Sequence, residues 1–365
     1  MIFFDHNATT PVDPRVVEAM MPYLTSGYGN ASSLYRLGRL SRSAIDSARE
    51  QVAALVDVSP AQVIFTSGGT ESNALAMQSF EGRSLFLSAI EHPAVSDNVL
   101  YRHAKYPRLE ILPVAANGVL TVACIENLEL GVGDVICLML ANNETGALQP
   151  VADLVSKASS VGAFVHTDAV QALGKIPISF NALGALSMSL SSHKIYGPKG
   201  CGALVRSHQM GVKPLLYGGD QEQALRAGTE NVAAIVGFGK AAELARLEFE
   251  SRTQHLIQLR AHLEKGLSRI PGLVIFAEKT ARLPNTVQFA VPETHGEMLL
   301  MQLDKKGIAV SSGSACKAGS QEPSPVLIAM GIEPKLAQSA IRVSLGKDNS
   351  FQQIDEFLSV LQTLV

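Results

Sequence analysis

The chain has 365 residues, 47% of them hydrophobic, and its 30 basic and 33 acidic side chains give a net charge of −3. This length allows two domains and a large core, and the charge balance argues against binding to nucleic acid. No apolar run is long enough to cross a membrane, the N-terminus lacks a secretory signal, and the four cysteines form no Cys-x-x-Cys pair. We therefore expect a cytoplasmic protein with no metal site, no direct nucleic-acid partner and no membrane partner.

The first part of the chain predicts an α/β fold. Asp13 and Pro14 can begin a helix over 15–24, because Asp is a common N-cap and Pro a common first helical residue. Strand-like runs then alternate with helical stretches up to about residue 230; the runs are 63–66, 84–88, 135–140 and 163–167. This alternation predicts a mostly parallel sheet flanked by helices, and such sheets bind ligands at the carboxyl ends of their strands.

A glycine-rich turn follows the strand at 63–66. Gly68, Gly69 and Thr70 lead into a helix-compatible stretch, and backbone amides at a helix N-terminus bind phosphate. The spacing matches neither a nucleotide-binding P-loop nor a dinucleotide-binding motif. Gly69 and Thr70 are therefore candidate ligands for a phosphate that does not belong to a nucleotide, although glycine-rich turns of this kind are common.

Polar side chains follow the next two strands. His92 comes after the run at 84–88. An imidazole is flat and titrates near neutral pH, so it suits both stacking on a ring and proton transfer; a histidine satisfied within a loop is the alternative. Asn143 follows the run at 135–140, and its amide can bond a cofactor oxygen or a substrate carboxylate. A turn asparagine fits the sequence equally well.

Asp168 follows the strand at 163–167, at the carboxyl end where α/β sheets bind ligands. A carboxylate there can keep a pyridine nitrogen protonated, which makes the ring an electron sink. Gln171 is three residues further on, so one helical turn places it on the same face, within reach of the ring's phenolic oxygen. An aspartate that only caps a helix is the alternative.

Lys194 ends the run Ser191-Ser192-His193-Lys194, 26 residues after that aspartate. A lysine becomes a covalent catalyst when its amine loses a proton and attacks a carbonyl. Ser191 and His193 offer hydrogen bonds to a phosphate, and the glycines and proline that follow hold an irregular turn close to a bulky ligand. Together these features suit pyridoxal phosphate (PLP). Taken alone, the run also fits a surface lysine in a loop.

The C-terminal part predicts a smaller α+β domain. A long helix over 232–270 suits a connector, and it stops at Pro271. Strand-like and helical runs follow it; they are 273–276, 286–291, 297–306, 308–310 and 351–364. We expect a large domain over 13–250 and a small domain that includes 251–365.

Two residues of this part are candidates for chemistry. Arg342 lies in an apolar strand-like run, where a buried guanidinium is costly unless it is paired. A clamp on a substrate carboxylate and an internal salt bridge both meet that need. Cys316 lies in a segment of Ser, Gly and Ala residues that we expect to be a mobile loop, and Lys317 favours its thiolate form.

Seven motifs, taken in order, resemble those of the cysteine desulfurases of the NifS and IscS type, which are class V, fold-type I PLP enzymes. The resemblance extends from Phe4 to Gly346. The motifs are 66–73, 91–92, 142–144, 166–171, 191–194, 226–231 and 311–316. The resemblance implies that PLP is held covalently by Lys194, that His92 stacks on the PLP ring, and that residues 1–12 join the small domain. The implied cofactor ligands are Gly69, Thr70, His92, Asn143, Asp168, Gln171, Ser191, Ser192, His193, Lys194 and, from across a homodimer interface, Thr229.

The resemblance also implies a reaction. L-Cysteine binds through Asn143 and Arg342, the Lys194 amine removes the α-proton, and the Cys316 thiolate takes the sulfur as a persulfide while alanine leaves. An acceptor protein then receives the sulfur for iron–sulfur cluster assembly or for thiolation of tRNA or DNA. Because the chain ends at Val365, directly after the last predicted helix, we expect a narrower acceptor than a general iron–sulfur scaffold. A selenocysteine lyase or another class V PLP enzyme is the alternative, but an aminotransferase has no use for Cys316.

Overall fold

The computed structural model describes residues 1–312 and 322–365. Within these residues, the centre of the protein is a seven-stranded sheet. Its strands, in spatial order, are β2 (Val63–Thr66), β8 (Gly202–Arg206), β7 (Ser187–Ser191), β6 (Phe164–Asp168), β5 (Val135–Cys137), β3 (Leu85–Ser88) and β4 (Leu109–Leu112). The run from β7 to β4 is parallel, whereas β8 is antiparallel to both of its neighbours.

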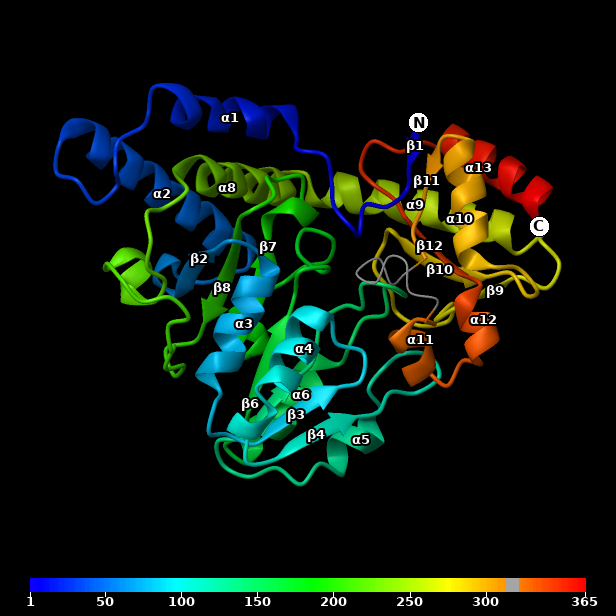
Figure 1. The fold of residues 1–365 in the computed structure, drawn as a ribbon, viewed down its shortest axis with the longest axis horizontal. Coiled ribbons are helices and arrows are strands. Elements are labelled where there is room, and N and C mark those ends of the chain that lie inside the picture. Colours follow the sequence, from blue (N-terminus) through cyan, green and yellow to red (C-terminus); the bar gives the residue numbers. More distant parts are fainter. Residues whose placement is uncertain (313–321) are drawn as a thin grey trace.

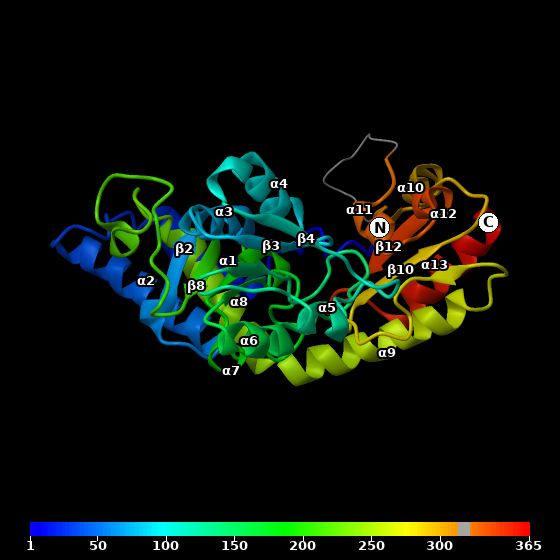
Figure 2. The same cartoon turned by 90° about the horizontal axis from the view of Figure 1, so that it is seen from below.

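Helices cover both faces of this sheet (Figures 1 and 2). They are α1 (Pro14–Thr25), α2 (Arg36–Leu55), α3 (Gly69–Ser79), α4 (Pro93–Tyr101), α5 (Val122–Glu126), α6 (Val151–Ser160), α7 (Phe180–Leu183) and α8 (Val232–Leu247). Alternate residues of a strand point to opposite faces. On β2, Val63 and Phe65 share a core with α1, α2 and α8, whereas Ile64 packs with α3 and α4. Short 3-10 turns add η1 (Pro60–Gln62), η2 (His103–Lys105), η3 (Ser192–Lys194) and η4 (Gln221–Ala224).

A second group of elements packs at one end of this sheet, on the right in Figure 1. Its strands are β1 (Ile2–Phe3), β9 (Val274–Ile275), β10 (Thr286–Ala290), β11 (Ile308–Ala309) and β12 (Ala340–Ser344), and its helices are α9 (Phe249–Leu267), α10 (Gly296–Lys305), α11 (Pro325–Ala329), α12 (Pro334–Gln338) and α13 (Phe351–Leu364). In the described part, β12, β10 and β9 form an antiparallel sheet and β1 pairs with β11. Phe4, Phe289 and Phe357 belong to one core there, so the N-terminus packs with the C-terminal elements.

The predicted α/β fold with a mostly parallel sheet is confirmed, and the strands at 63–66 and 85–88 lie within a residue of their predicted bounds. The prediction of one continuous helix over 232–270 is wrong. Glu248 leaves the helical conformation (φ −102°, ψ 11°) and separates α8 from α9. Its carboxylate accepts hydrogen bonds from Arg15 and Arg252, so tertiary contacts hold the break.

The described residues contain no helix with the length and apolar composition needed to cross a bilayer. Nor do they bring three His, Cys, Asp or Glu side chains together as a metal site requires.

Candidate active site

A cavity of about 240 Å³ lies at the carboxyl ends of β6 and β7. Asp168 ends β6, Ser191 ends β7, and Ala8 of the N-terminal segment forms part of the wall. The residues predicted for the site that line this cavity are Gly69, Thr70, His92, Asn143, Asp168, Gln171, Ser191, His193 and Lys194. The fold therefore gathers them at the sheet edge where α/β proteins bind ligands.

Lys194 extends from η3, the short turn after β7. Its Nζ donates to the carbonyl oxygen of Ala8 at 2.7 Å and to that of Asn7. Tyr196, two residues further on, has a φ of +69°, a conformation that non-glycine residues adopt only when their surroundings hold them. Its backbone N–H donates to Thr10 Oγ1 at 2.8 Å. The N-terminal segment thus fixes both the turn and the lysine amine.

Asp168 is 6% exposed and accepts hydrogen bonds on both carboxylate oxygens. Oδ2 accepts from Asn73 Nδ2 at 2.7 Å, and Oδ1 accepts from the backbone N–H of Val170 at 2.9 Å, a contact typical of a helix cap. Asn73 Oδ1 lies 3.1 Å from His166 Nε2, and His166 Nδ1 lies 2.8 Å from Ser187 Oγ. Burial lowers the pKa of His166 to about 3, so this neutral imidazole is a fixed partner in a network that orients Asp168.

His92 is the N-cap of α4, and its Nδ1 accepts a hydrogen bond from the backbone N–H of Ala94 at 3.0 Å. A neutral imidazole therefore carries its proton on Nε2. Burial is the main cause that lowers the pKa of His92, with Asp168 opposing it and Lys194 adding to it. His193 is also lowered, to a pKa of about 4, by burial and by the charge of Lys194. Both imidazoles are thus mostly neutral at pH 7.

Gly69, Thr70 and Ser191 form a part of the cavity wall that suits a phosphate. Gly69 begins α3, and a Cβ at this position would lie 2.8 Å from Val170 Cγ2, so a side chain would not fit. Ser191 Oγ is buried without a hydrogen-bond partner in the described residues. Free amides at a helix N-terminus and an unpartnered hydroxyl fit a phosphate. With Lys194 for the aldehyde and Asp168 for the ring nitrogen, the residues present fit PLP.

Gln171, which lines the cavity, and Asn7 are joined by hydrogen bonds next to Lys194. Gln171 Nε2 donates to the Asn7 carbonyl oxygen at 2.9 Å, and Gln171 Oε1 accepts from Lys175 Nζ at 3.1 Å. Asn7 Oδ1 accepts from the same Nζ at 3.2 Å, and Asn7 Nδ2 donates to the carbonyl oxygen of Asn143 at 3.2 Å. One asparagine of the N-terminal segment therefore connects several groups of the cavity.

Arg342 is 2% exposed and lies in β12. Its Nη2 forms an ion pair with Asp5 Oδ1 at 2.7 Å, and its Nη1 donates to the carbonyl oxygen of Asn143 at 3.0 Å. Of the two roles that the sequence left open, the internal ion pair is present. The substrate clamp stays a prediction, supported by the contact with Asn143, which lines the cavity.

Of the predicted site residues that the structure describes, Ser192, Thr229 and Arg342 do not line this cavity. Ser192 faces away from it: its Oγ would lie 2.1 Å from a Cβ at Gly197, because the chain turns at η3 and neighbouring side chains point in different directions. Thr229 lines a second cavity, of about 230 Å³, with Arg226 and Gly228. Cys316 and the loop expected around it lie outside the described residues.

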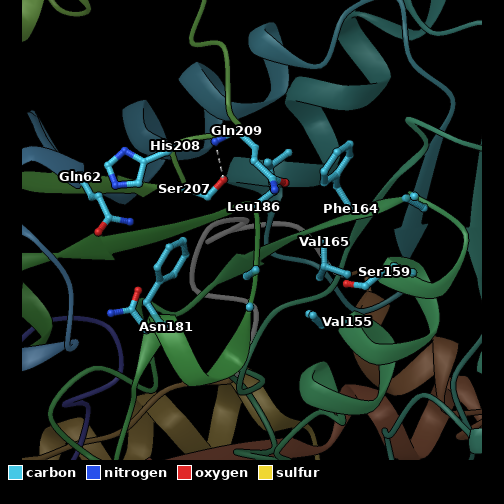
Figure 3. A pocket seen from close by; sticks show the side chains of 16 residues that line it. Gln62, Val155, Ser159, Phe164, Val165, Asn181, Leu186, Ser207, His208 and Gln209 are labelled. Atoms are coloured by element: carbon cyan, nitrogen blue, oxygen red, sulfur yellow. Dashed lines mark hydrogen bonds between the residues drawn. The ribbon is translucent and has the colours of Figure 1, made fainter.

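A larger cavity, of about 560 Å³, lies at the opposite edge of the sheet, where Phe164 begins β6 (Figure 3). Leu186, just before β7, lines it as well. Among the described residues that line this space, His208 is the only one with an ionisable side chain. The larger cavity therefore lacks the lysine and the carboxylate that covalent catalysis needs, and we assign the chemistry to the smaller one.

The sequence analysis missed the residues that hold the predicted ones in place. His166 and Asp168 are two residues apart on one strand, so period-two alternation places them on one face and could have revealed the histidine. Asn73 stands one helical turn after Thr70, in a motif already noted. Asn7 has no local signal of this kind, because its contacts come from segments far away in the sequence.

Comparisons with known proteins agree with this geometry. The sequence model of the class V aminotransferase family matches residues 2–357. The cysteine desulfurase IscS of Methanosarcina thermophila is 40% identical over an alignment that covers 100% of this chain and 92% of that protein. The X-ray structure of a NifS-like protein from Rickettsia africae has a TM-score of 0.91 at 33% identity and covers 100% of this chain and 99% of that one. A structure of SspA in complex with cysteine has a TM-score of 0.83 at 29% identity, covering 96% and 100%.

The fold and the cavity define a PLP enzyme, with a lysine and an aspartate at the carboxyl edge of an α/β sheet. The chain belongs to the class V aminotransferase family and, within it, to the cysteine desulfurases. The resemblance seen in the sequence and the PLP cofactor are thereby confirmed.

Proposed function

We propose that this chain removes sulfur from L-cysteine, giving L-alanine and a persulfide on Cys316. The observation that carries the proposal is one cavity that contains the amine of Lys194, the carboxylate of Asp168 and the imidazole of His92, in a member of the cysteine desulfurases. PLP bound there supplies an electron sink for the α-carbon of the substrate. Lys194 holds the cofactor covalently, Asp168 keeps its ring nitrogen protonated, and His92 stacks on the ring.

The substrate carboxylate is bound by Arg342 and Asn143. The Lys194 amine takes the proton from the α-carbon of cysteine, which requires it to be neutral at that moment. The Cys316 thiolate then attacks the substrate sulfur. One S–S bond forms, the C–S bond breaks, and the carbon that loses sulfur takes a proton. The Lys194 amine returns a proton to the α-carbon, so that alanine leaves. The persulfide passes to an acceptor protein for iron–sulfur cluster assembly or for thiolation of tRNA or DNA, in the cytoplasm.

The same proposal includes a homodimer with shared sites. Thr229 lines a cavity separate from that of Lys194, which suits a threonine that serves the cofactor phosphate of a second copy. Exposed apolar side chains on and around α1 and the start of α2, at the left end in Figure 1, suit an interface. They are Val17, Met21, Leu24, Tyr28, Leu34, Tyr35 and Leu40. We also propose that residues 13–250 act as one domain and 1–12 with 251–365 as the other.

Subunit mixing tests the shared site. Lys194→Ala and Thr229→Ala variants, each weak alone, are mixed under conditions that exchange subunits. If Thr229 completes the partner's site, half of the dimers carry one intact site, and activity returns to about a quarter of the wild-type value. Mixed variants that gain no activity, or a fully active monomer in sedimentation, would contradict the proposal.

Cys316→Ser tests the reaction itself. A hydroxyl at neutral pH is a far weaker nucleophile than a thiolate, so this variant should bind PLP, change its spectrum on addition of L-cysteine, and release almost no alanine. Intact mass should show a persulfide on the wild type and none on the variant. Cys124→Ser, at a half-buried position away from the cavity, is the control. Alanine release by Cys316→Ser at the wild-type rate would indicate a lyase that frees sulfur without a protein thiol.

A further inference from the structure

Lys175 is a buried lysine without an acidic partner. It is 7% exposed, and it forms no ion pair within the part of the chain that the structure describes. Its Nζ donates to Asn7 Oδ1 and Gln171 Oε1, which are neutral amide oxygens. A buried ammonium costs free energy unless it is paired with a charge. Lys175 also lines, with Lys194, a small cavity of about 20 Å³ behind the active site, so this cost is incurred next to the catalytic lysine.

Of the two acceptors of Lys175, Gln171 lines the cofactor cavity, and Asn7 binds Lys194 through its backbone carbonyl. The Asn7 carbonyl oxygen accepts hydrogen bonds from Lys194 Nζ and Gln171 Nε2, and Gln171 lines the cavity. An ammonium can only donate hydrogen bonds, so it binds the oxygen end of the Gln171 amide and never the nitrogen end. Lys175 therefore decides which end of that amide is turned toward Asn7 and the cavity.

We propose that Lys175 is a positioning residue for the cofactor: its ammonium fixes Gln171 and Asn7 so that the amide nitrogen of Gln171 is presented to bound PLP and the Lys194 amine stays in place. This inference rests on the proposed function, because it takes PLP to occupy the cavity. It adds a residue that touches neither cofactor nor substrate and acts through two that border the site.

If Lys175 only stabilised the fold, its replacement should lower the melting temperature; a positioning role predicts that stability is kept. Burial lowers the pKa of Lys175 to about 7, with the charges of Lys194 and Arg342 adding to the shift, so its charged form is disfavoured in the folded protein. A methionine fills similar space without a charge, and replacing a buried charge by an apolar group of similar volume is often neutral or stabilising. Lys175→Met should therefore leave thermal stability equal or higher while it weakens cofactor binding.

The test is a double-mutant cycle on the full-length protein, with reconstitution by PLP as the readout. Lys175→Met should raise the apparent Kd of PLP roughly 3- to 10-fold, the effect of one misdirected hydrogen bond, and should shift the absorption maximum of the bound cofactor. In the Gln171→Leu background the same substitution should change the Kd less than about twofold, because its target is gone. Lys175→Gln keeps one N–H donor for Gln171 Oε1 and should restore part of the affinity.

Lys347→Met is the matched control. Lys347 lines the same small cavity, but it has carboxylate partners in Asp13 at 3.6 Å and Asp348 at 2.9 Å. We expect this variant to leave the Kd and the absorption maximum of bound PLP unchanged.

Two results would overturn the inference. The first is that Lys175→Met changes the Kd of PLP equally in the wild-type and Gln171→Leu backgrounds. The second is that both Lys175 variants have a lowered melting temperature and an unchanged cofactor spectrum. Borohydride reduction and peptide mapping of the wild type separate this failure from that of the proposed function. If PLP maps to a lysine other than Lys194, the proposed function fails and this inference with it. If PLP maps to Lys194, the cycle alone decides.

Discussion

The two edges of the large sheet present opposite surroundings. At the carboxyl edge, a cavity of about 240 Å³ contains Asp168, Lys194, His92 and His193. At the amino edge lies a cavity more than twice as large, about 560 Å³. Among its described lining residues, only His208 has an ionisable side chain. The size of a cavity therefore does not identify the active site of this protein. Ionisable groups with shifted pKa values, gathered at a strand end, identify it.

The carboxyl edge also carries a cost that the amino edge does not. Burial raises the pKa of Glu91 to about 8 and lowers that of Lys175 to about 7. Each shift means that burial disfavours the charged form, and the folded protein gives up stability accordingly. If this comparison is correct, substitutions at the carboxyl edge should impair function and can raise stability, whereas substitutions at the amino edge should do neither.

The largest effect is expected at Lys194. Lys194→Ala removes the amine that we propose binds the cofactor and moves the α-proton, and loss of a general base alone costs roughly 10²- to 10⁴-fold in rate. Lys199→Ala, at an exposed lysine five residues away, is the control and should keep full activity. Alanine release and peptide mapping after borohydride reduction measure the two effects. A Lys194→Ala protein that still carries covalently bound PLP would break the assignment.

Arg342 should show the next largest effect. Arg342→Lys keeps the charge but loses the planar fork, so the KM for L-cysteine should rise roughly 10- to 150-fold while the PLP spectrum stays unchanged. Asp5→Asn removes the ion-pair partner and leaves the guanidinium available to substrate. It should lower stability without a comparable rise in KM. If the two variants lose stability equally and neither changes KM, the internal ion pair is the whole role of Arg342.

Glu91 allows the stability lost by burying ionisable groups at the carboxyl edge to be measured. Its carboxyl accepts a hydrogen bond from the backbone N–H of Met139 at 2.7 Å, and burial raises its pKa from 4.5 to about 8. In the unfolded chain Glu91 loses its proton near pH 4.5, whereas in the folded protein it keeps it up to about pH 8. The unfolded state therefore binds fewer protons in this window, and stability falls as the pH rises through it.

Glu91→Gln removes this titration. We expect its free energy of unfolding to exceed that of the wild type by roughly 4 kcal/mol at pH 8 and to approach the wild-type value near pH 4.5, as a shift of one pKa unit corresponds to about 1.4 kcal/mol. Urea unfolding at several pH values measures the difference. If the free energy of unfolding changes with pH in the same way for the two proteins, burial of Glu91 does not lower the stability of the wild type.

Much of this arrangement could be predicted from the sequence because it is local. Asp168 follows the apolar run at 163–167, and the end of a parallel strand fixes the edge at which its last residue lies. Lys194 is marked by its local Ser-Ser-His-Lys motif. Ser192, which the resemblance implies as a cofactor ligand, does not line the cavity, since neighbouring residues after a strand end face different ways and the sequence does not say which one faces the ligand. Its role as a ligand stays a prediction. The break at Glu248 was also missed, because one of the two arginines that bind its carboxylate, Arg15, lies 233 residues away in the sequence.

The supporting residues could not be predicted for a related reason. Asn7 contacts Asn143, Gln171 and Lys175, all more than a hundred residues away in the sequence, and such contacts depend on how the elements pack. Lys175 is a lysine in an otherwise apolar stretch, which a sequence cannot distinguish from a surface lysine. Its role follows from burial and from hydrogen bonds that exist only in the folded protein.

The smallest effect is expected at the amino edge, where His208→Ala should change nothing that concerns the cofactor. His208 is exposed and lies at the rim of the larger cavity (Figure 3). Surface substitutions away from caps and networks usually change the free energy of unfolding by less than about 0.5 kcal/mol. We therefore expect wild-type PLP content, a wild-type KM and stability within that range.

His92→Ala is the matched change at the other edge. It removes both the N-cap of α4, at about 1 kcal/mol, and the ring that we propose stacks on the cofactor, so it should lower both stability and PLP retention. Absorbance of the bound cofactor after dialysis, together with urea unfolding, compares the two histidines directly. A loss of PLP from His208→Ala equal to that from His92→Ala would mean that the two edges are not independent, and that the larger cavity has a role in the function of the smaller one.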